Sequence, residues 1–186
     1  MKHFFAGALL LLFGIIAGCD QLTEFSISED TINHYLAKHT NYSKKIGIAG
    51  IADASIDLSN LSAQIGRTEP NKITLTGVAK INLASLLGST QAEVSLAITS
   101  LPYFDVEAGA IYLKELEISD YKITPEKMTT TISPILPIVN NSLKAYFEKN
   151  PVYSLQPEKS KAEALAKKIA KGLEVKPGKL VIPLVE

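Results

Sequence analysis

The sequence predicts an α+β fold in which a curved antiparallel sheet of four or more strands wraps around a long amphipathic helix. Apolar and polar side chains alternate along four consecutive segments between about residues 54 and 123, the period of strands with one buried face. The next segment, about residues 125–149, repeats its apolar residues at helical spacing, and an apolar sheet face needs such a cover. A shorter helix is expected at each end of the domain.

Residues 1–18 have the layout of a secretory signal. Lys2 and His3 precede an uncharged apolar stretch, residues 4–17, which is too short for an ordinary membrane span. The run Ile16-Ala17-Gly18-Cys19 then matches the bacterial lipobox, in which the cysteine is acylated and the chain is cut just before it. The alternative is an uncleaved anchor helix that ends in an accidental cysteine.

Cys19 is the only cysteine, so it has no partner for an intramolecular disulfide, and acylation explains its presence in an exported chain. We therefore predict a signal peptide at 1–18, a lipidated tether at 19–25 and a single domain at 26–186. Asp20 follows the lipidated residue directly. Because an acidic residue there tends to retain lipoproteins of enteric bacteria in the inner membrane, we expect the periplasmic side of that membrane, with the outer membrane as the alternative.

Composition limits the partners. Basic and acidic residues are equal in number, 19 of each, and no basic run occurs. This balance argues against nucleic acid as a partner and against electrostatic docking on anionic lipid. Tryptophan is absent and aromatic residues make up 7% of the chain, so the core is expected to be aliphatic.

The first predicted element is a helix over about residues 29–38, with Ser28 in a position to cap its N-terminus. Apolar and aromatic residues recur along one face at helical spacing. The helix carries His34 and His39. Neither histidine has a second ligand at metal spacing, so both are interpreted as ordinary helix residues rather than as metal ligands.

Four strands are expected to follow. The first changes the parity of its apolar residues near Asn60, which predicts a β-bulge. The second, residues 73–83, shows the clearest alternation in the chain. The third, about residues 92–98, is expected to end before Pro102, and the fourth to span about residues 110–123.

The long helix over about residues 125–149 contains Pro134 and Pro137. Each proline removes a backbone donor and can kink or interrupt a helix. We expect one bent helix; two separate helices are the alternative.

A lysine- and alanine-rich helix is expected over about residues 158–171, ended by Gly172. Its clustered lysines are interpreted as a solvated face rather than a binding patch; they are Lys167, Lys168 and Lys171. A last strand over about residues 180–185 contains Pro183, which predicts an edge position or a bulge.

No catalytic motif is present. The chain lacks a nucleophile elbow, a phosphate-binding loop, a dinucleotide fingerprint and a metal-binding histidine pair. Glu115 and Glu117 are paired on one strand but are interpreted as solvated carboxylates. We therefore predict no enzymatic activity and no cofactor. A hydrolase that uses His34 or His39 is the remaining enzymatic alternative, and no spacing supports it.

The apolar helix and sheet can meet in two ways. They can close into a plain core, or they can leave a groove lined by aliphatic side chains. Gly77 and Ala79 lie midway along the clearest strand, where small side chains would leave room. The residues predicted to line a groove come from the apolar faces of the two central strands and the long helix: Ile73, Leu75, Ile81, Leu96, Ile132, Leu136, Val139 and Leu143.

Several segments resemble the YceB-like bacterial lipoproteins, a family without an established reaction. They are Cys19-Asp20-Gln21-Leu22-Thr23, Gln64-Ile65-Gly66-Arg67, Glu69-Pro70-Asn71-Lys72, Gly109-Ala110-Ile111-Tyr112-Leu113-Lys114-Glu115 and Gly172-Leu173-Glu174-Val175-Lys176-Pro177-Gly178. The family is similar in fold to the tubular lipid-binding superfamily, which includes bactericidal permeability-increasing protein. In that fold a curved sheet wraps a long helix and lipids lie in the cleft between them.

The resemblance implies a membrane-anchored periplasmic lipoprotein that binds a lipid or acyl chain between helix and sheet, for transport or sensing. The alternative is a non-enzymatic scaffold lipoprotein that binds a periplasmic protein through its outer surface. The expected partners are a membrane, reached through the N-terminal lipid, and a hydrophobic ligand. Neither the ligand nor a protein partner is identified by the sequence.

Overall fold

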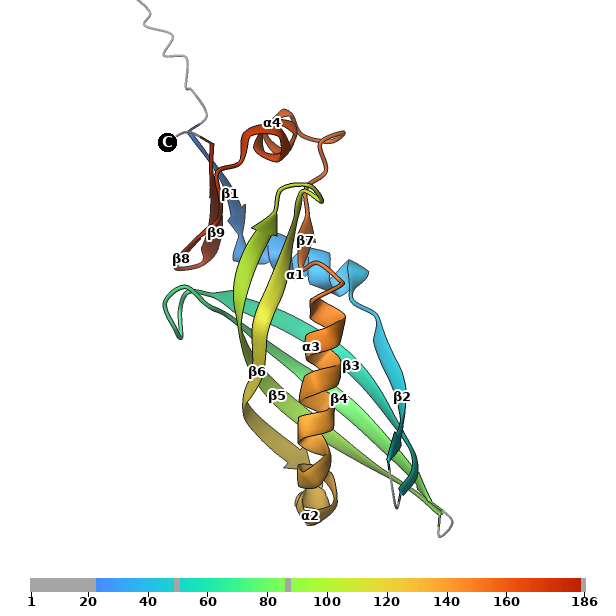
Figure 1. Cartoon of the computed structure of the whole chain (residues 1–186). Helices are drawn as coiled ribbons and strands as arrows, with labels where there is room; N and C mark the ends of the chain where they lie inside the picture. Colours follow the sequence, from blue (N-terminus) through green and yellow to red (C-terminus); the bar gives the residue numbers. More distant parts are fainter. Residues whose placement is uncertain (1–22, 49–50, 86–87, 185–186) are drawn as a thin grey trace, which may run out of the picture.

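The computed structural model describes residues 23–48, 51–85 and 88–184, which form two antiparallel sheets and several helices. The large sheet has the strand order β2-β3-β4-β5-β6-β7 and forms an elongated body (Figure 1). The small sheet has the order β1-β9-β8 and lies at one end of that body, beside the start of the described chain. The strands are β1 (Glu24–Ser28), β2 (Tyr42–Ile48), β3 (Ile51–Ile65), β4 (Ile73–Ser85), β5 (Gly88–Asp105), β6 (Ala110–Thr124), β7 (Tyr153–Ser154), β8 (Glu174–Lys176) and β9 (Lys179–Pro183).

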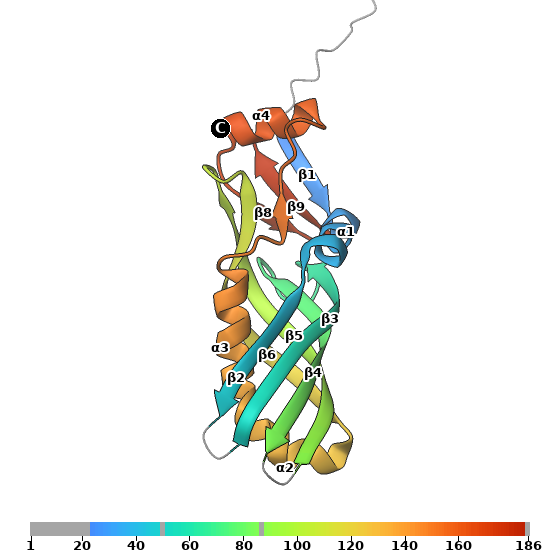
Figure 2. The ribbon, with the colours of Figure 1, turned by 90° about the vertical axis from the view of Figure 1, so that its right-hand side faces the viewer.

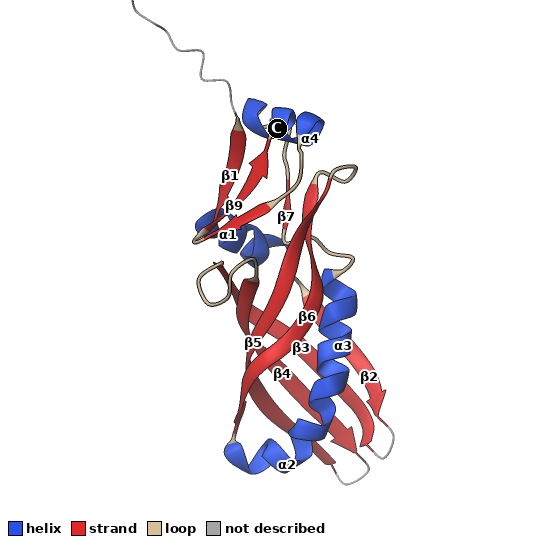
Figure 3. Ribbon diagram, turned by 60° about the vertical axis from the view of Figure 1, so that its left-hand side comes forward, coloured by secondary structure: helices blue, strands red, loops and turns tan. Residues whose placement is uncertain are grey.

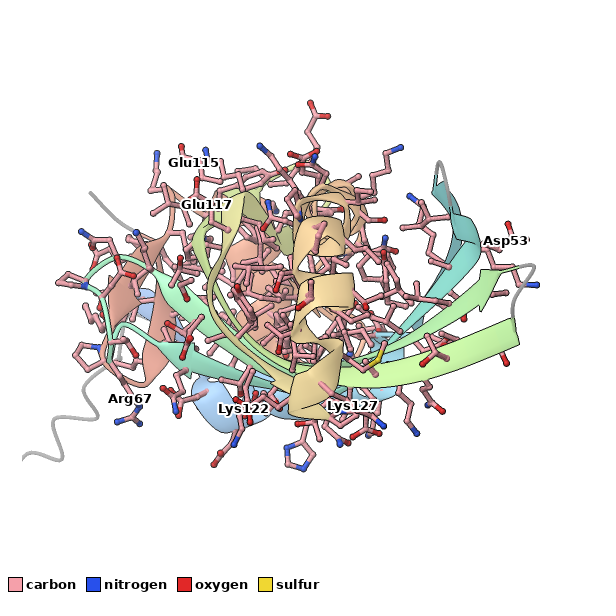
Figure 4. The ribbon with its side chains drawn as sticks, turned by 90° about the horizontal axis from the view of Figure 1, so that it is seen from below. Asp53, Arg67, Glu115, Glu117, Lys122 and Lys127 are labelled. Carbon is pink, nitrogen blue, oxygen red and sulfur yellow. The ribbon has the colours of Figure 1, made fainter. Side chains whose placement is uncertain are left out.

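The described residues form four α-helices: α1 (Glu29–His39), α2 (Thr129–Ile132), α3 (Leu136–Phe147) and α4 (Lys161–Ile169). Two 3-10 turns, Glu126–Met128 and Ser133–Ile135, lie before α2 and before α3. The large sheet curls, and α3 lies along its concave side (Figure 4). The short helix α2 lies at the end of the body far from the small sheet, and α4 lies beyond the small sheet at the opposite end (Figures 2 and 3).

The predicted fold class is confirmed: a curved antiparallel sheet faces a long helix. The N-terminal helix is also where the sequence placed it, and the Ser28 hydroxyl accepts a hydrogen bond from the Thr31 amide at 3.1 Å. The predicted bulge is present in β3, whose pairing with β4 shifts between Ser59 and Ser62. Asn60, inside that shift, has a φ of 54°, which asparagine tolerates better than most residues.

Strand β5 is longer than predicted. It continues through Pro102, which lies opposite Leu113, and ends at Asp105. The expected end before Pro102 is therefore wrong. The β5–β6 ladder is irregular just before this proline, between Thr99 and Leu101, and strands tolerate proline at such bulges.

The long helical segment is interrupted rather than simply bent. Pro134 lies in the 3-10 turn Ser133–Ile135, which separates α2 from α3. Pro137 lies in the first turn of α3, where a missing amide donor costs little. The two prolines thus act differently: one falls in the break and the other is compatible with the start of the next helix.

The C-terminal helix is shorter than predicted. The Ser160 hydroxyl caps α4 by accepting from the Glu163 amide at 3.3 Å, and Ala170 already has an extended conformation. Gly172, the expected end, therefore lies outside the helix. The shortening has a local cause, because a serine cap fixes where the first turn begins.

Three strands were not predicted from the sequence: β1, β2 and β8. Strand β1 begins at Glu24, inside the segment predicted as a tether, and pairs with β9. Strand β2 is an edge strand. Three consecutive residues of it are exposed, Ser43, Lys44 and Lys45, so the strand shows no run of alternating apolar positions.

Helix α1 connects the two sheets at an edge that no strand covers. Beyond Leu58, β3 no longer pairs with β2. There the Asn33 side chain accepts from the Ala63 amide at 2.6 Å and donates to the Ala63 carbonyl at 3.3 Å. Glu29 accepts from the Ile65 amide at 2.9 Å. Side chains of α1 therefore replace the missing strand.

Within the described ranges, no helix has the length and apolar character needed to cross a bilayer.

Candidate ligand site between the long helix and the sheet

The concave face of the large sheet and the inner face of α2 and α3 meet in one aliphatic core. All eight residues predicted to line a groove lie here, and each is between 0% and 7% exposed. They pack within one continuous cluster of isoleucine, leucine and valine side chains. Their role in ligand binding stays a prediction.

The core contains few polar groups, and these are paired. Among the described residues, no buried side-chain nitrogen or oxygen lacks a hydrogen-bond partner. The buried polar pair next to α3 is Tyr42 of β2 with Ser142 of α3. An interior of this kind suits apolar ligand atoms and offers little to a polar one.

On one side α3 faces the edge strand β2, and the contact depends on aromatic side chains. The Tyr42 hydroxyl donates to the Ser142 hydroxyl at 2.7 Å. The Tyr42 ring meets Tyr146 edge-to-face at 5.1 Å between centroids, and Tyr146 meets Phe147 in the same way, also at 5.1 Å. Burial raises the pKa of Tyr42 above its ordinary value, although the Ser142 hydrogen bond acts in the opposite direction.

On the other side α3 faces β6, whose outer edge pairs with β7 only at Ala110 and Ile111. Farther along this edge, the Asn140 side-chain oxygen accepts from the Ile118 amide at 2.8 Å. In the described part of the chain, no backbone hydrogen bond joins α3 to a strand. Side chains alone therefore close both margins of the helix.

A groove of about 440 Å³ lies beside the start of α3 and is open to solvent. Its lining comes from β6, the 3-10 turn and α3: Glu117, Ile118, Tyr121, Ser133, Leu136, Pro137 and Asn140. Leu136 is also a member of the buried core. The groove therefore reaches the aliphatic interior at this residue, and its volume is in the range of small-ligand sites.

The other grooves do not border the break before α3, as this one does through Ser133, Leu136 and Pro137. A cleft of about 690 Å³ lies between the far end of β5 and β8, and its lining includes Lys114, Glu174 and Lys176. A groove of about 350 Å³ holds Leu96 together with polar residues of the sheet. A third, of about 270 Å³, follows the margin between β2 and α3 and is lined by Tyr42, among others. The groove at Leu136 is therefore the candidate site.

The room predicted at Gly77 between helix and sheet is not found, because Gly77 instead lines the groove of about 350 Å³, whose lining includes no residue of α3. A Cβ atom at this position would lie 2.9 Å from Leu61 Cδ2, so the Leu61 side chain occupies the space. The sequence could not show this, because the bulge at Asn60 shifts the register of Leu61 along β4.

Of the described histidines and paired carboxylates that the sequence singled out, Glu117 lines the groove and His34, His39 and Glu115 do not. His34 and His39 are exposed on α1, and the His39 ring stacks on Tyr35 at 4.2 Å. Glu115 and Glu117 are both exposed and lie on the same side of the molecule (Figure 4). Cys19 and Asp20 lie outside the described residues.

Sequence reasoning missed three features at or beside the candidate site. The Tyr42–Ser142 pair joins residues far apart in the chain, and no local pattern indicates it. Tyr121 lies on β6 and lines the groove. Asn140 did carry a signal, since it interrupts an apolar helical repeat next to the inward-facing Val139.

A sequence model described as a protein of unknown function, DUF1439, matches residues 27–179. An uncharacterized lipoprotein YceB of Salmonella typhimurium is 54% identical over 183 residues, covering 98% of both chains. The uncharacterized lipoprotein YceB of Escherichia coli is 50% identical over 186 residues, covering 100% of both. A crystal structure of lipopolysaccharide binding protein aligns with a TM-score of 0.41 and 11% identity over 87% of this chain and 48% of that one.

We predict that Asn140→Ala lowers the free energy of unfolding by about 1–3 kcal/mol, because the Ile118 amide loses its acceptor at an edge that no strand covers. Asn141→Ala is the matched control, since Asn141 is the next residue and is exposed. Urea unfolding measures both. Equal midpoints for the two variants would show that Asn140 does not hold this margin.

We also predict that the protein loses stability above about pH 10. The folded-state pKa of Tyr42 is raised, so its contribution is complete below the unfolded-state pKa of about 10 and is lost as pH rises through the folded-state value. Tyr153, whose pKa burial raises to about 12, acts in the same direction. Tyr42→Phe should cost about 1 kcal/mol at neutral pH and make the alkaline loss shallower.

The control for this titration is Tyr121→Phe, because Tyr121 is 46% exposed. Chemical unfolding across pH 8 to 12 measures the effect. A parallel alkaline loss in the wild type and in Tyr42→Phe would contradict the assignment to Tyr42.

Proposed function

We propose, starting from the fact that the chain belongs to the DUF1439 family, that it is a lipid-anchored protein of the bacterial envelope that binds a lipid or acyl chain. The ligand would lie between α3 and the concave face of the large sheet. The observation that carries the proposal is the position of Leu136, which belongs to the aliphatic core and also lines the open groove of about 440 Å³.

Helix α3 can separate from the sheet without breaking a strand ladder, because no backbone hydrogen bond joins it to a strand in the described ranges. Neighbouring strands of the large sheet share long ladders of backbone hydrogen bonds. Helix α3 is held at its margins by Asn140 and by the Tyr42–Ser142 pair. Each such hydrogen bond contributes about 1 kcal/mol net, so opening one margin leaves the sheet intact.

The interior supplies a reason for an apolar ligand to enter. Side chains that α3 buries, such as Val139 and Leu143, are fully enclosed by aliphatic neighbours. An acyl chain that took the place of these contacts would recover about 0.8 kcal/mol for each buried methylene. A polar ligand would find no such compensation.

The break before α3 supports movement at the groove. The 3-10 turn Ser133–Ile135 carries Pro134, and Ser133 itself lines the groove. Stretches of 3-10 geometry inside a helical segment often act as hinges. We propose that α3 swings about this turn when a ligand enters.

Binding rather than catalysis is the proposed role. The groove lining contains one carboxylate, Glu117, and no histidine or cysteine. Attachment through an acylated Cys19 is supported by the lipobox and by the relatives, which are named lipoproteins. Asp20 favours the inner membrane within this proposal.

We predict that a dansyl-labelled fatty acid binds saturably to the purified protein and that Val139→Phe weakens this binding. Val139 is fully buried in the site, and the larger ring would occupy the space between helix and sheet that the ligand needs. Such overpacking also lowers the free energy of unfolding by about 1–3 kcal/mol. Val139→Ala creates space and should bind at least as tightly as the wild type. Dansyl fluorescence titration measures binding.

Ile138→Phe and Ile138→Ala are the matched controls, because Ile138 is the preceding residue and is 36% exposed. Unfolding midpoints establish that each variant is folded. If no variant binds the probe saturably, and mass spectrometry of gently purified protein finds no lipid, the proposal fails and a scaffold role becomes the better account.

We predict that Cys19→Ala yields an unprocessed precursor or a product that does not fractionate with membranes. The reason is that acylation of this thiol is the proposed attachment. Asp20→Ser should shift the protein from the inner toward the outer membrane fraction. Immunoblotting of separated membranes measures both. A Cys19→Ala product that still matures and still sediments with membranes would contradict the anchor.

A further inference from the structure

The outward face of α4 combines apolar and basic side chains. Leu165 and Ile169 are 36% and 37% exposed although both are large and aliphatic. Lys161 and Lys168 are exposed as well, and the four positions fall at i, i+4, i+7 and i+8, which is one stripe of a helix. We call this stripe the α4 face. Its inward side is buried at Ala166.

The acidic residue of this helix does not belong to the α4 face. Glu163 accepts hydrogen bonds from the Tyr153 hydroxyl at 3.2 Å and from the Gln156 amide, so it joins α4 to the body. Over residues 157–172 the chain holds five lysines against two glutamates. Residues 157–172 are therefore basic although the charges of the whole chain balance.

The α4 face lies at the end of the molecule where the described chain starts. Helix α4 packs against β1, the first strand, and both lie at the same end in Figures 1 and 2. Cys19 precedes Thr23, the first described residue, by only four positions. Four residues span at most about 14 Å, so an acyl anchor on Cys19 would hold this end close to the bilayer surface.

A third exposed apolar residue, outside α4 itself, lies beside this helix. The turn between β5 and β6 carries Val106, which is 50% exposed. The Lys167 side chain covers this turn, since a Cβ atom on Gly109 would lie 2.9 Å from Lys167 Cδ. The turn and the helix therefore form one continuous end surface.

We propose that the α4 face and the Val106 turn dock onto the membrane leaflet that holds the Cys19 anchor. Leu165, Ile169 and Val106 enter the interface between headgroups and acyl chains, and Lys161 and Lys168 contact lipid phosphates. This inference rests on the anchoring part of the proposed function. In this orientation the long axis of the body points away from the bilayer surface, and the groove at Leu136 opens on a side of the body rather than at the docked end.

The test uses the full lipidated protein in vesicles of phosphatidylethanolamine and phosphatidylglycerol. Leu165→Cys and Ile138→Cys each introduce one free thiol, because Cys19 is blocked by acylation, and the two positions are equally exposed at 36%. Both are labelled with an environment-sensitive fluorophore. Nitroxide-labelled lipid in the vesicles should quench the label at 165 several-fold more than the label at 138.

The contribution of the lysines to the docking of α4 is measured in the same vesicles. With Lys161→Gln or Lys168→Gln added, the ratio of docked to undocked α4 should fall by about fivefold for each lysine. Lys127→Gln, on the 3-10 turn at the far end, is the control. Replacing phosphatidylglycerol with phosphatidylcholine should have the same effect as the lysine changes.

Two outcomes are distinguishable. Protein that floats with the vesicles but shows equal quenching at 165 and 138 overturns the docking of α4 and leaves the anchor intact. Protein that does not float overturns the anchor and the docking with it.

Discussion

The structure depends on closing a curled sheet that does not close on itself. Strands β2 and β6 leave backbone groups without a neighbouring strand, and unpaired polar groups cannot be buried at no cost. The protein meets this constraint with helices whose side chains accept hydrogen bonds from the unpaired strand amides. Asn33 and Glu29 accept hydrogen bonds from amides of β3, and Asn140 accepts one from an amide of β6. At the margin of β2, Tyr42 and Ser142 instead join strand and helix through their side chains. The same arrangement makes α3 separable, since no backbone ladder holds it.

The separate roles of the sheet and the helices relate the proposed ligand site to the proposed membrane contact. In the proposal the sheet stays intact while α3 moves, and the small sheet with α4 forms an end piece where the described chain starts. A ligand that leaves or enters a bilayer would meet α4 first and the groove at Leu136 farther along the body. Anchoring, docking and ligand binding thus use different surfaces of one chain, and substitutions can separate them.

The parts that the sequence predicted are those set by local periodicity. Strand β4 and the interior residues Ile73 and Leu75 follow from alternation, and Val139 and Leu143 follow from helical spacing. The parts it missed depend on contacts between distant segments. The edge strand β2 has lysines where alternation would need apolar residues, and β1 pairs with β9 across almost the whole chain. The Tyr42–Ser142 and Asn140–Ile118 contacts likewise have no local signature. Gly77 shows the limit most clearly, because only the folded register reveals that Leu61 fills its space.

Movement of α3 relative to β2 is the central claim, and a distance measurement tests it most directly. Spin labels on Lys44→Cys and Ala145→Cys would report across this margin, because both positions are exposed beside the groove that holds Tyr42. The account predicts one short distance in the delipidated protein and a second, longer distance that grows in population as a fatty acid is added. A single distance that stays unchanged at saturating fatty acid would contradict the account.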